Sequence, residues 1–327
     1  MGMPSSRISC SGSLRPPSSA GGRHPFSPKS PYLAASSALL DESLLRKLEV
    51  LSLATRRPAY GQLRGMHRSR RTGSGLVFTD FRPYSAGDDI RRIDWSIYLR
   101  LDRLILKLFE EEADVPIYLF LDASLSMDFG TPTKLDYARR AAAALAYVAL
   151  LNHDRVSLVA FADGIVQALP TRRGKNQAPQ AFRFLENIRA SGQTSLHATL
   201  REFFSTPRTR GIAIVISDFL DPDGIEPAFA VFRRFRHEVA AVHVVAKEER
   251  DPPLPEEVVL IDAEDGSANE LEVTPSLLEA YRETFARHVR DIEAYCRKYG
   301  WGYVQAATEV PIESLMLRVL REQGLLR

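Results

Sequence analysis

The chain has 327 residues, of which 45% are hydrophobic and 26% are charged, and its formal net charge is +2. This composition is typical of a soluble globular protein, and the small net charge excludes a strong overall field towards nucleic acid or an anionic membrane. The two cysteines, Cys10 and Cys296, lie in very different contexts, so we expect no disulfide framework and a cytoplasmic, reducing location. The longest apolar run, 141–151, is too short to span a bilayer and predicts a buried helix.

The N-terminal part of the chain changes character twice. Residues 1–37 are rich in Ser, Pro, Gly and Arg, which predicts a disordered tail because such a segment buries too little apolar surface. Leucines at helical spacing predict a helix over 39–53, with Asp41 as its N-cap. The basic, glycine-punctuated stretch 56–71 predicts a loop, and 104–109 predicts a strand.

Beyond Pro116, short apolar strands alternate with helices. This alternation predicts an α/β fold, namely a doubly wound, mainly parallel sheet with helices on both faces. We therefore divide the chain into a tail (1–37), an N-terminal segment packed on the sheet (38–113) and an α/β domain (114–327). The expected strands are 117–121, 156–161, 165–169, 212–216, 239–245 and 303–306, the expected helices 134–151, 178–189, 196–204, 227–236, 275–299 and 312–320, and the expected hairpin 258–261 with 271–273.

Five oxygen-bearing side chains fall where the sheet would bring them together. Asp122 ends the first strand of the domain, and Ser124 and Ser126 follow in the loop that leads to the first helix. Asp218 ends the fourth strand, and Thr194 precedes a helix. In open α/β sheets, ligands bind at the carboxyl ends of the strands. If the first and fourth strands are neighbours, all five side chains converge on one crevice.

Two carboxylates and three hydroxyls form a set of hard oxygen donors. Such a set suits Mg²⁺, Mn²⁺ or Ca²⁺ and argues against zinc or copper. The pair of carboxylates neutralises the ion, which leaves a coordination position for a carboxylate from a partner. The alternative is that Asp122 and the two serines only cap the first helix.

The pattern Asp122, Ser124 and Ser126, followed by Thr194 and Asp218, resembles the metal-ion-dependent adhesion site of von Willebrand factor A domains. This resemblance implies a von Willebrand factor A-like fold for residues 114–327. It also implies a domain that binds a partner rather than an enzyme.

A second group of residues lies upstream of this domain. The segments 81–84, 87–91 and 93–95, with Arg100 after them, closely resemble the bacterial domain-of-unknown-function 58 family. The resemblance extends over about residues 40 to 320. It implies a MoxR-type AAA+ ATPase as partner. The charged and aromatic residues of this upstream motif are Arg82, Asp88, Asp89, Arg91, Asp94, Trp95 and Arg100.

The upstream motif has two interpretations. Charges of both signs at close spacing favour a structural latch that holds the segment on the sheet, with Trp95 as a large buried anchor. The same residues are also compatible with a recognition surface for a partner.

Two other functions remain open. A metal-dependent hydrolase would need a second acid where Ser124 stands, or Ser124 or Ser126 as nucleophile with His153 or His197 as base, and no Gly-x-Ser-x-Gly elbow surrounds either serine. A nucleic-acid binder would use the basic stretch 56–71, which holds a single aromatic residue. A second basic patch comprises Arg172, Arg173 and Lys175.

Overall fold

The fold is known from a computed structural model. It describes residues 39–55, 77–85, 87–110, 116–250, 252, 257–261, 268–272 and 274–322. The predicted tail and the basic stretch 56–71 lie outside these residues. Within the described ranges, no helix is long and apolar enough to cross a membrane.

A six-stranded sheet forms the centre of the domain, with the strand order β10-β7-β6-β3-β4-β5. All neighbouring strands are parallel except β4 and β5 at one edge. This arrangement confirms the predicted mainly parallel sheet, and it makes the first and fourth strands of the domain direct neighbours. The strands are β3 (Pro116–Asp122), β4 (Arg155–Phe161), β5 (Ile165–Arg173), β6 (Ile212–Ser217), β7 (Glu238–Val245) and β10 (Gly302–Ala307).

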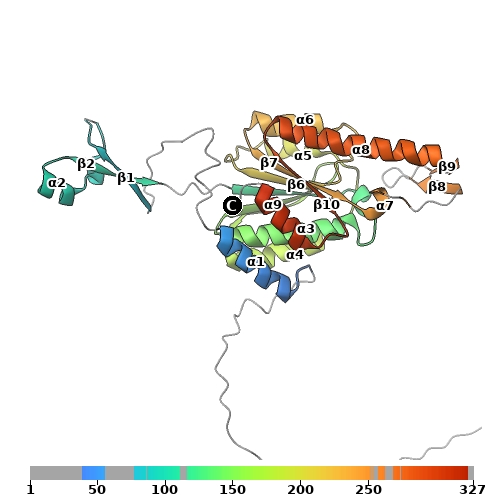
Figure 1. Ribbon diagram of the computed structural model, residues 1–327, viewed down its shortest axis with the longest axis horizontal. Coiled ribbons are helices and arrows are strands. Elements are labelled where there is room, and N and C mark those ends of the chain that lie inside the picture. Colours follow the sequence, from blue (N-terminus) through green and yellow to red (C-terminus); the bar gives the residue numbers. More distant parts are fainter. Residues whose placement is uncertain are drawn as a thin grey trace, which may run out of the picture. The chain divides into compact units, whose positions relative to one another are not determined.

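Helices cover both faces of this sheet, as expected (Figure 1). The side chains of β3 alternate between two apolar clusters, with Leu119 and Leu121 on one face and Tyr118 and Phe120 on the other. Every residue of β3 is buried, which explains its continuous apolar sequence. One face packs against α1 (Glu42–Thr55), α3 (Lys134–Leu151), α4 (Ala178–Asn187) and α9 (Ile312–Glu322), and the other against α5 (Leu196–Phe203), α6 (Ile225–Arg234) and α8 (Pro275–Lys298).

Helix α3 lies against the middle of the sheet and confirms the buried helix predicted for 141–151. Its run of alanines, 141–144, is completely buried, and such small side chains allow the helix to approach the strands closely. Thr133 caps the helix, since its hydroxyl accepts a hydrogen bond of 3.1 Å from the Asp136 amide.

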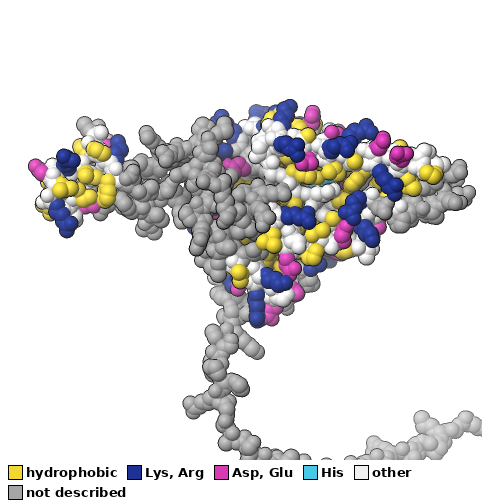
Figure 2. Space-filling view, viewed as in Figure 1, with side chains coloured by type: hydrophobic (Ala, Val, Ile, Leu, Met, Phe, Trp, Pro, Cys, Tyr) yellow, Lys and Arg dark blue, Asp and Glu magenta, His cyan; other side chains and the backbone are white. Residues whose placement is uncertain are grey.

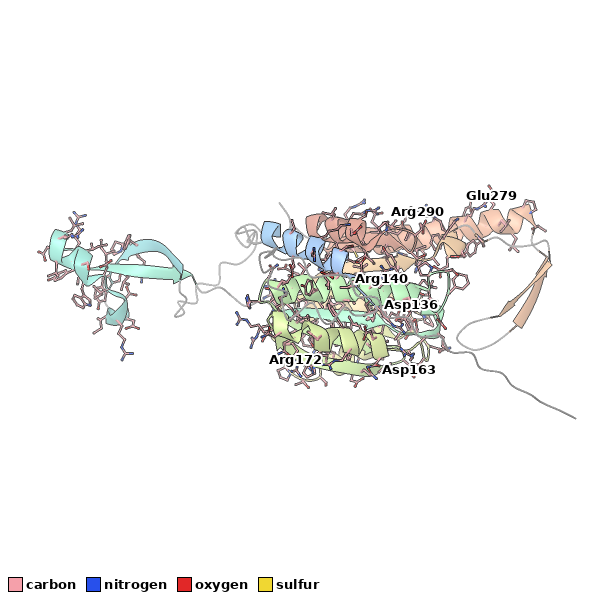
Figure 3. The ribbon with its side chains drawn as sticks, turned by 90° about the horizontal axis from the view of Figure 1, so that it is seen from below. Asp136, Arg140, Asp163, Arg172, Glu279 and Arg290 are labelled. Atoms are coloured by element: carbon pink, nitrogen blue, oxygen red, sulfur yellow. The ribbon has the colours of Figure 1, made fainter. Side chains whose placement is uncertain are left out.

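Helix α1 packs on α3, so the segment 42–55 lies against the α/β domain (Figure 3). Asp41 is its N-cap and accepts a hydrogen bond of 2.9 Å from the Leu44 amide. Tyr147 of α3 donates a hydrogen bond of 2.8 Å to Glu49. Leu40 and Leu48 are fully buried in the core of this face.

The upstream motif contains a two-stranded sheet and a short helix. Strands β1 (Val77–Pro83) and β2 (Ile105–Glu110) pair antiparallel, and helix α2 (Trp95–Leu101) lies between them in sequence. The spacing of apolar residues predicted neither β1 nor α2. The prediction that Trp95 is a buried anchor is wrong, because 56% of its surface is exposed. The buried positions are the two before it, Ile93 and Asp94, and α2 buries none of its residues.

The remaining elements are short. The predicted hairpin consists of β8 and β9, which pair antiparallel. Helix α7 directly follows β7 and carries a residue of the candidate site. The bounds are β8 (Glu257–Ile261), β9 (Ala268–Glu272) and α7 (Lys247–Arg250), with 3-10 turns at Ile90–Arg92, Leu125–Met127 and Lys175–Gln177.

Candidate metal-binding site

The candidate site lies at the carboxyl ends of β3 and β6. Leu121 and Ile216 are partners in the parallel register, so the next residues, Asp122 and Ser217, end neighbouring strands side by side. Asp218 follows Ser217 directly. Both aspartates are buried, with exposed fractions of 0% and 2%. The sheet therefore brings the two predicted carboxylates together, as the sequence indicated.

A chain of hydrogen bonds joins the two strand ends through the loop that carries Ser124 and Ser126, which we call the serine loop. The Ser124 amide donates to Asp122 Oδ1 at 3.0 Å. The hydroxyls of Ser124 and Ser126 are 3.0 Å apart, and Ser126 Oγ donates to Asp218 Oδ2 at 2.9 Å. Four of the five predicted ligands thus form one connected group.

Thr194, the fifth predicted ligand, lies on a loop that is fastened to the serine loop. The Ser191 amide donates to the Ala123 carbonyl at 2.8 Å, and the Leu125 amide donates to the Gly192 carbonyl at 3.1 Å. The Thr194 side chain is 3% exposed, and its buried hydroxyl has no hydrogen-bond partner among the residues that the structure describes. A buried hydroxyl without a partner is costly, which points to a ligand such as a metal ion or its bound water.

Ser217, which is not among the predicted ligands, also belongs to the site. Its hydroxyl donates a hydrogen bond of 2.5 Å to Asp122 Oδ2 and accepts one of 2.8 Å from the Phe219 amide. These two bonds fix the orientation of the Asp122 carboxylate. The position of Ser217, next to Asp218 at the end of an apolar strand, is a sequence signal that could have identified it.

Lys134, the first residue of α3, is a second unpredicted residue of the site. Its ammonium lies 2.7 Å from Asp218 Oδ2 and forms a second ion pair with Glu249 of α7. Only 1% of the lysine side chain is exposed. A positive charge at a helix N-terminus opposes the helix dipole, and this unfavourable placement was the available sequence signal.

The two aspartates differ in their electrostatic environment. Burial, and then the charge of Asp218, raises the pKa of Asp122 to about 7. Burial also acts to raise the pKa of Asp218, but the charge and hydrogen bond of Lys134 outweigh it and hold this pKa below its usual value. One cation therefore offsets Asp218, whereas Asp122 has no cation of its own in the described part of the site.

The residues present fit a hard divalent cation. All five predicted ligands offer oxygen atoms, and one of them is a hydroxyl without a partner. Among the described residues, no group of three or more His, Cys, Asp and Glu side chains is placed to hold a metal. A metal at this place would therefore depend on hydroxyl ligands as well as on the two carboxylates.

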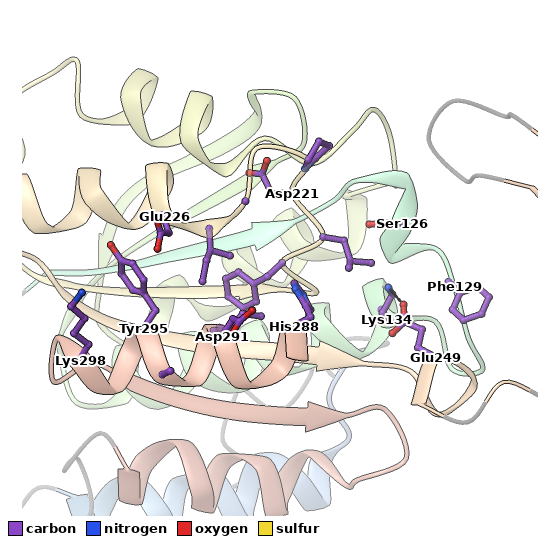
Figure 4. A pocket seen from close by; sticks show the side chains of 17 residues that line it. Ser126, Phe129, Lys134, Asp221, Glu226, Glu249, His288, Asp291, Tyr295 and Lys298 are labelled. Carbon is purple, nitrogen blue, oxygen red and sulfur yellow. Dashed lines mark hydrogen bonds and ion pairs between the residues drawn. The ribbon is translucent and has the colours of Figure 1, made fainter. Parts of the chain in front are cut away.

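A groove opens from the site and runs along α8 (Figure 4). Its volume is about 1040 Å³. Ser126, Lys134 and Glu249 line one end, and Tyr295 and Lys298 line the other. His288 is in the wall, with Nε2 at 3.4 Å from the Asp218 backbone carbonyl. Of the five predicted ligands, Ser126 lines this groove, and the other four are buried behind it.

The carboxylates of the upstream motif serve local structure. Asp88 accepts hydrogen bonds from Arg82 at 2.7 Å and from the Ser85 amide at 2.9 Å. Asp89 accepts from the Arg91 amide at 3.0 Å. Asp94 caps α2, and the side chains of Trp95, Arg91 and Arg100 are exposed. Arg82 and Asp88 form an ion pair within the motif.

The second basic patch forms bonds within the domain. Arg172 donates to Gln180 at 3.0 Å, Arg173 donates to the His153 carbonyl at 2.9 Å, and Lys175 forms an ion pair of 2.7 Å with Glu49. On the face drawn in Figure 2, Lys and Arg side chains lie among Asp and Glu side chains and do not form one block.

Comparisons with known proteins agree with the family resemblance of the upstream motif. The family described as "Protein of unknown function DUF58" matches residues 80–295. One protein of Mycobacterium bovis and one of Mycobacterium tuberculosis, both described as uncharacterized, are each 30% identical over 268 residues, covering 80% of this chain and 83% of the relative.

Solved structures resemble the chain more distantly. The conserved hypothetical protein BatB from Bacteroides thetaiotaomicron matches at a TM-score of 0.39 and 17% identity, over 64% of this chain and 98% of that chain. An aerotolerance-related membrane protein from Bacteroides fragilis gives a TM-score of 0.39 at 19% identity, with the same coverage. The family match and the mycobacterial relatives decide the assignment: the chain belongs to the DUF58 family of proteins of unknown function.

Proposed function

We propose that the domain is a divalent-metal-dependent protein-binding module with a von Willebrand factor A-like fold. The observation that carries this proposal is the buried Thr194 hydroxyl without a described partner, on a loop fastened to the one that links Asp122 and Asp218. The expected ligands are Asp122, Ser124, Ser126, Thr194 and Asp218, and the expected ion is Mg²⁺, with Mn²⁺ or Ca²⁺ as alternatives.

The ion would supply a fixed positive charge at the mouth of the groove. The hydroxyl ligands carry no charge. The bound ion therefore keeps more of its positive charge than it would if a third carboxylate were among its ligands. An Asp or Glu of a partner can then bind where water is otherwise bound. The groove along α8 offers space for the residues on either side of that carboxylate.

The two serines support binding more than hydrolysis. Their hydroxyls are bonded to each other and to Asp218, and neither is bonded to a histidine in the described part of the chain. The described part of the site therefore contains no Ser–His pair of the kind that activates a serine nucleophile.

The proposed partner is a MoxR-type AAA+ ATPase, which the family resemblance implies. Binding through the metal requires the ion, so recovery of the ATPase by the immobilised chain is expected to fall when EDTA is added. The double variant Ser124→Ala/Ser126→Ala is expected to recover little ATPase under either condition. Equal recovery by parent and variant, with and without EDTA, would remove the metal site as the docking site.

Metal binding itself is tested by calorimetric titration with Mg²⁺ or Mn²⁺. Asp122→Ala is expected to lose binding and to keep its fold by circular dichroism. Asp136→Ala is the matched control, because Asp136 is an exposed carboxylate at the start of α3 that pairs with Arg139. Equal affinity of the parent and Asp122→Ala would refute the site.

A further inference from the structure

Lys134 occupies an unusual position for a lysine. Its side chain is 1% exposed and ends between Asp218 and Glu249. Figure 4 shows Lys134 and Glu249 next to each other at the end of the groove that contains Ser126. The loop before α3 closes over the lysine, with the Phe129 ring centroid 6.0 Å from the ammonium.

Such a buried ammonium needs its carboxylates. Removing an ion from water costs several kcal/mol, and the N-terminus of α3 adds an unfavourable dipole. The two ion pairs, with Asp218 at 2.7 Å and with Glu249, offset these costs. The lysine is therefore charged and is held by the same aspartate that is expected to bind the metal.

The contacts of Asp218 overlap at one atom. Oδ2 accepts hydrogen bonds from Ser126 Oγ at 2.9 Å and from Lys134 Nζ at 2.7 Å. Two donors satisfy the two lone pairs of a carboxylate oxygen. Oδ1 accepts from the Leu220 amide at 3.1 Å. A metal ion that binds Oδ2 must therefore displace one of these two donors, and it repels the ammonium because both are positively charged.

We propose that Lys134 is a resident cation that competes with the divalent metal for Asp218, and that metal binding shifts its ammonium to Glu249. This inference rests on the proposed metal site. Without the metal, Lys134 neutralises Asp218 and keeps the two strand ends assembled. With the metal, the ammonium is repelled by the ion and retains Glu249 as its partner.

Glu249 is held in place to receive the ammonium. One of its carboxylate oxygens pairs with Lys134, and the other accepts a hydrogen bond of 3.0 Å from the Ala246 amide. Its backbone carbonyl accepts a hydrogen bond of 2.6 Å from Tyr281 of α8. The shift therefore moves a charge towards α7 without exposing it, and it couples the metal site to the wall of the groove.

The test is a calorimetric titration of the full chain with Mn²⁺. Lys134→Met keeps the length and apolar stem of the side chain and removes its charge, and Lys134→Gln retains an N–H donor for Asp218. The control is Arg250→Met, which removes a charge from α7, since Arg250 pairs with Glu309 at 2.6 Å and not with Asp218. Asp122→Ala combined with Lys134→Met shows whether the ion occupies the proposed site.

Lys134→Met is expected to bind Mn²⁺ more tightly than the parent by on the order of tenfold or more, because no ammonium competes for the carboxylate. Arg250→Met is expected to match the parent, and the double variant is expected to lose binding. Both Lys134 variants could also be unfolded without Mn²⁺ and refold when it is added. This result, measured by circular dichroism, would support the same exchange of cations.

Unchanged or weaker affinity in Lys134→Met would overturn the competition and leave the metal site intact. Binding that persists in the double variant would place the ion elsewhere and overturn it as well. Lys134 variants that stay unfolded with Mn²⁺ would show that a metal cannot replace the ammonium. Absence of Mn²⁺ binding in the parent and in both Lys134 variants would refute the metal site together with the competition.

Discussion

Ser217 Oγ donates a hydrogen bond of 2.5 Å to Asp122 Oδ2, so a residue at the end of β6 fixes a carboxylate at the end of β3. The bond lies in the buried layer beneath the serine loop, where water does not compete for it. The geometry of the site therefore depends on the pairing of two strands as much as on the loop that carries Ser124 and Ser126.

Ser217→Ala is expected to lower the free energy of unfolding by about 1–3 kcal/mol, because a buried carboxylate loses a donor. It is also expected to weaken Mg²⁺ binding, since Asp122 is no longer fixed. Denaturant titration and calorimetry measure the two effects. The control is Ser157→Ala. Ser157 is also a buried serine, and the substitution removes its hydrogen bond of 3.0 Å to the Leu169 carbonyl. Both variants should lose stability, but a matching loss of metal affinity in Ser157→Ala would contradict a specific role for Ser217.

Gly130 lies in the loop that closes over Lys134, with a backbone φ of +90°. A Cβ atom there would lie 2.8 Å from Ala246 Cβ, so Gly130→Ala combines backbone strain with a clash. We expect a loss of about 1–3 kcal/mol in denaturant titration. Gly224→Ala provides the comparison, because its φ of +73° is also positive but nothing lies within 4 Å of the added atom. Equal losses in the two variants would show that the contact with Ala246 is unimportant.

Cys296 is fully buried on α8, and burial raises the pKa of its thiol to about 12. The thiolate is the reactive form, so the folded protein should hold this thiol unreactive at pH 8. In a Cys10→Ser background, a thiol reagent is expected to label nothing until denaturant is added. Rapid labelling of the native protein would mean that α8 opens away from the sheet.

Trp95 is exposed, whereas Trp301 packs edge to face against Phe229 with ring centroids 5.5 Å apart. Trp95→Ala is therefore expected to change the free energy of unfolding by about 0.5 kcal/mol or less. Trp301→Ala should lower it by about 3 kcal/mol. Thermal and denaturant melts separate the two. A large loss in Trp95→Ala would restore the interpretation of Trp95 as a structural latch.

The amino-acid sequence by itself determined the α/β class, most helices and strands, and the positions of Asp122, Ser124, Ser126, Thr194 and Asp218 at strand ends and in loops. It did so because strands buried on both faces are continuously apolar, and because residues after such strands must lie at the edge of the sheet. The same pattern did not reveal β1 or α2, since short elements with little burial carry no apolar period.

Only the tertiary structure placed Lys134 and Glu249 at the site and Ser217 beneath it. Lys134 and Glu249 are far apart in the sequence, and their pairing depends on how α3 and α7 meet beside the ends of β3 and β6. Likewise, the exposure of Trp95 depends on which side of a seven-residue helix meets other residues. Contacts between distant segments follow from packing in three dimensions, for which the spacing of residue types along the chain carries no signal.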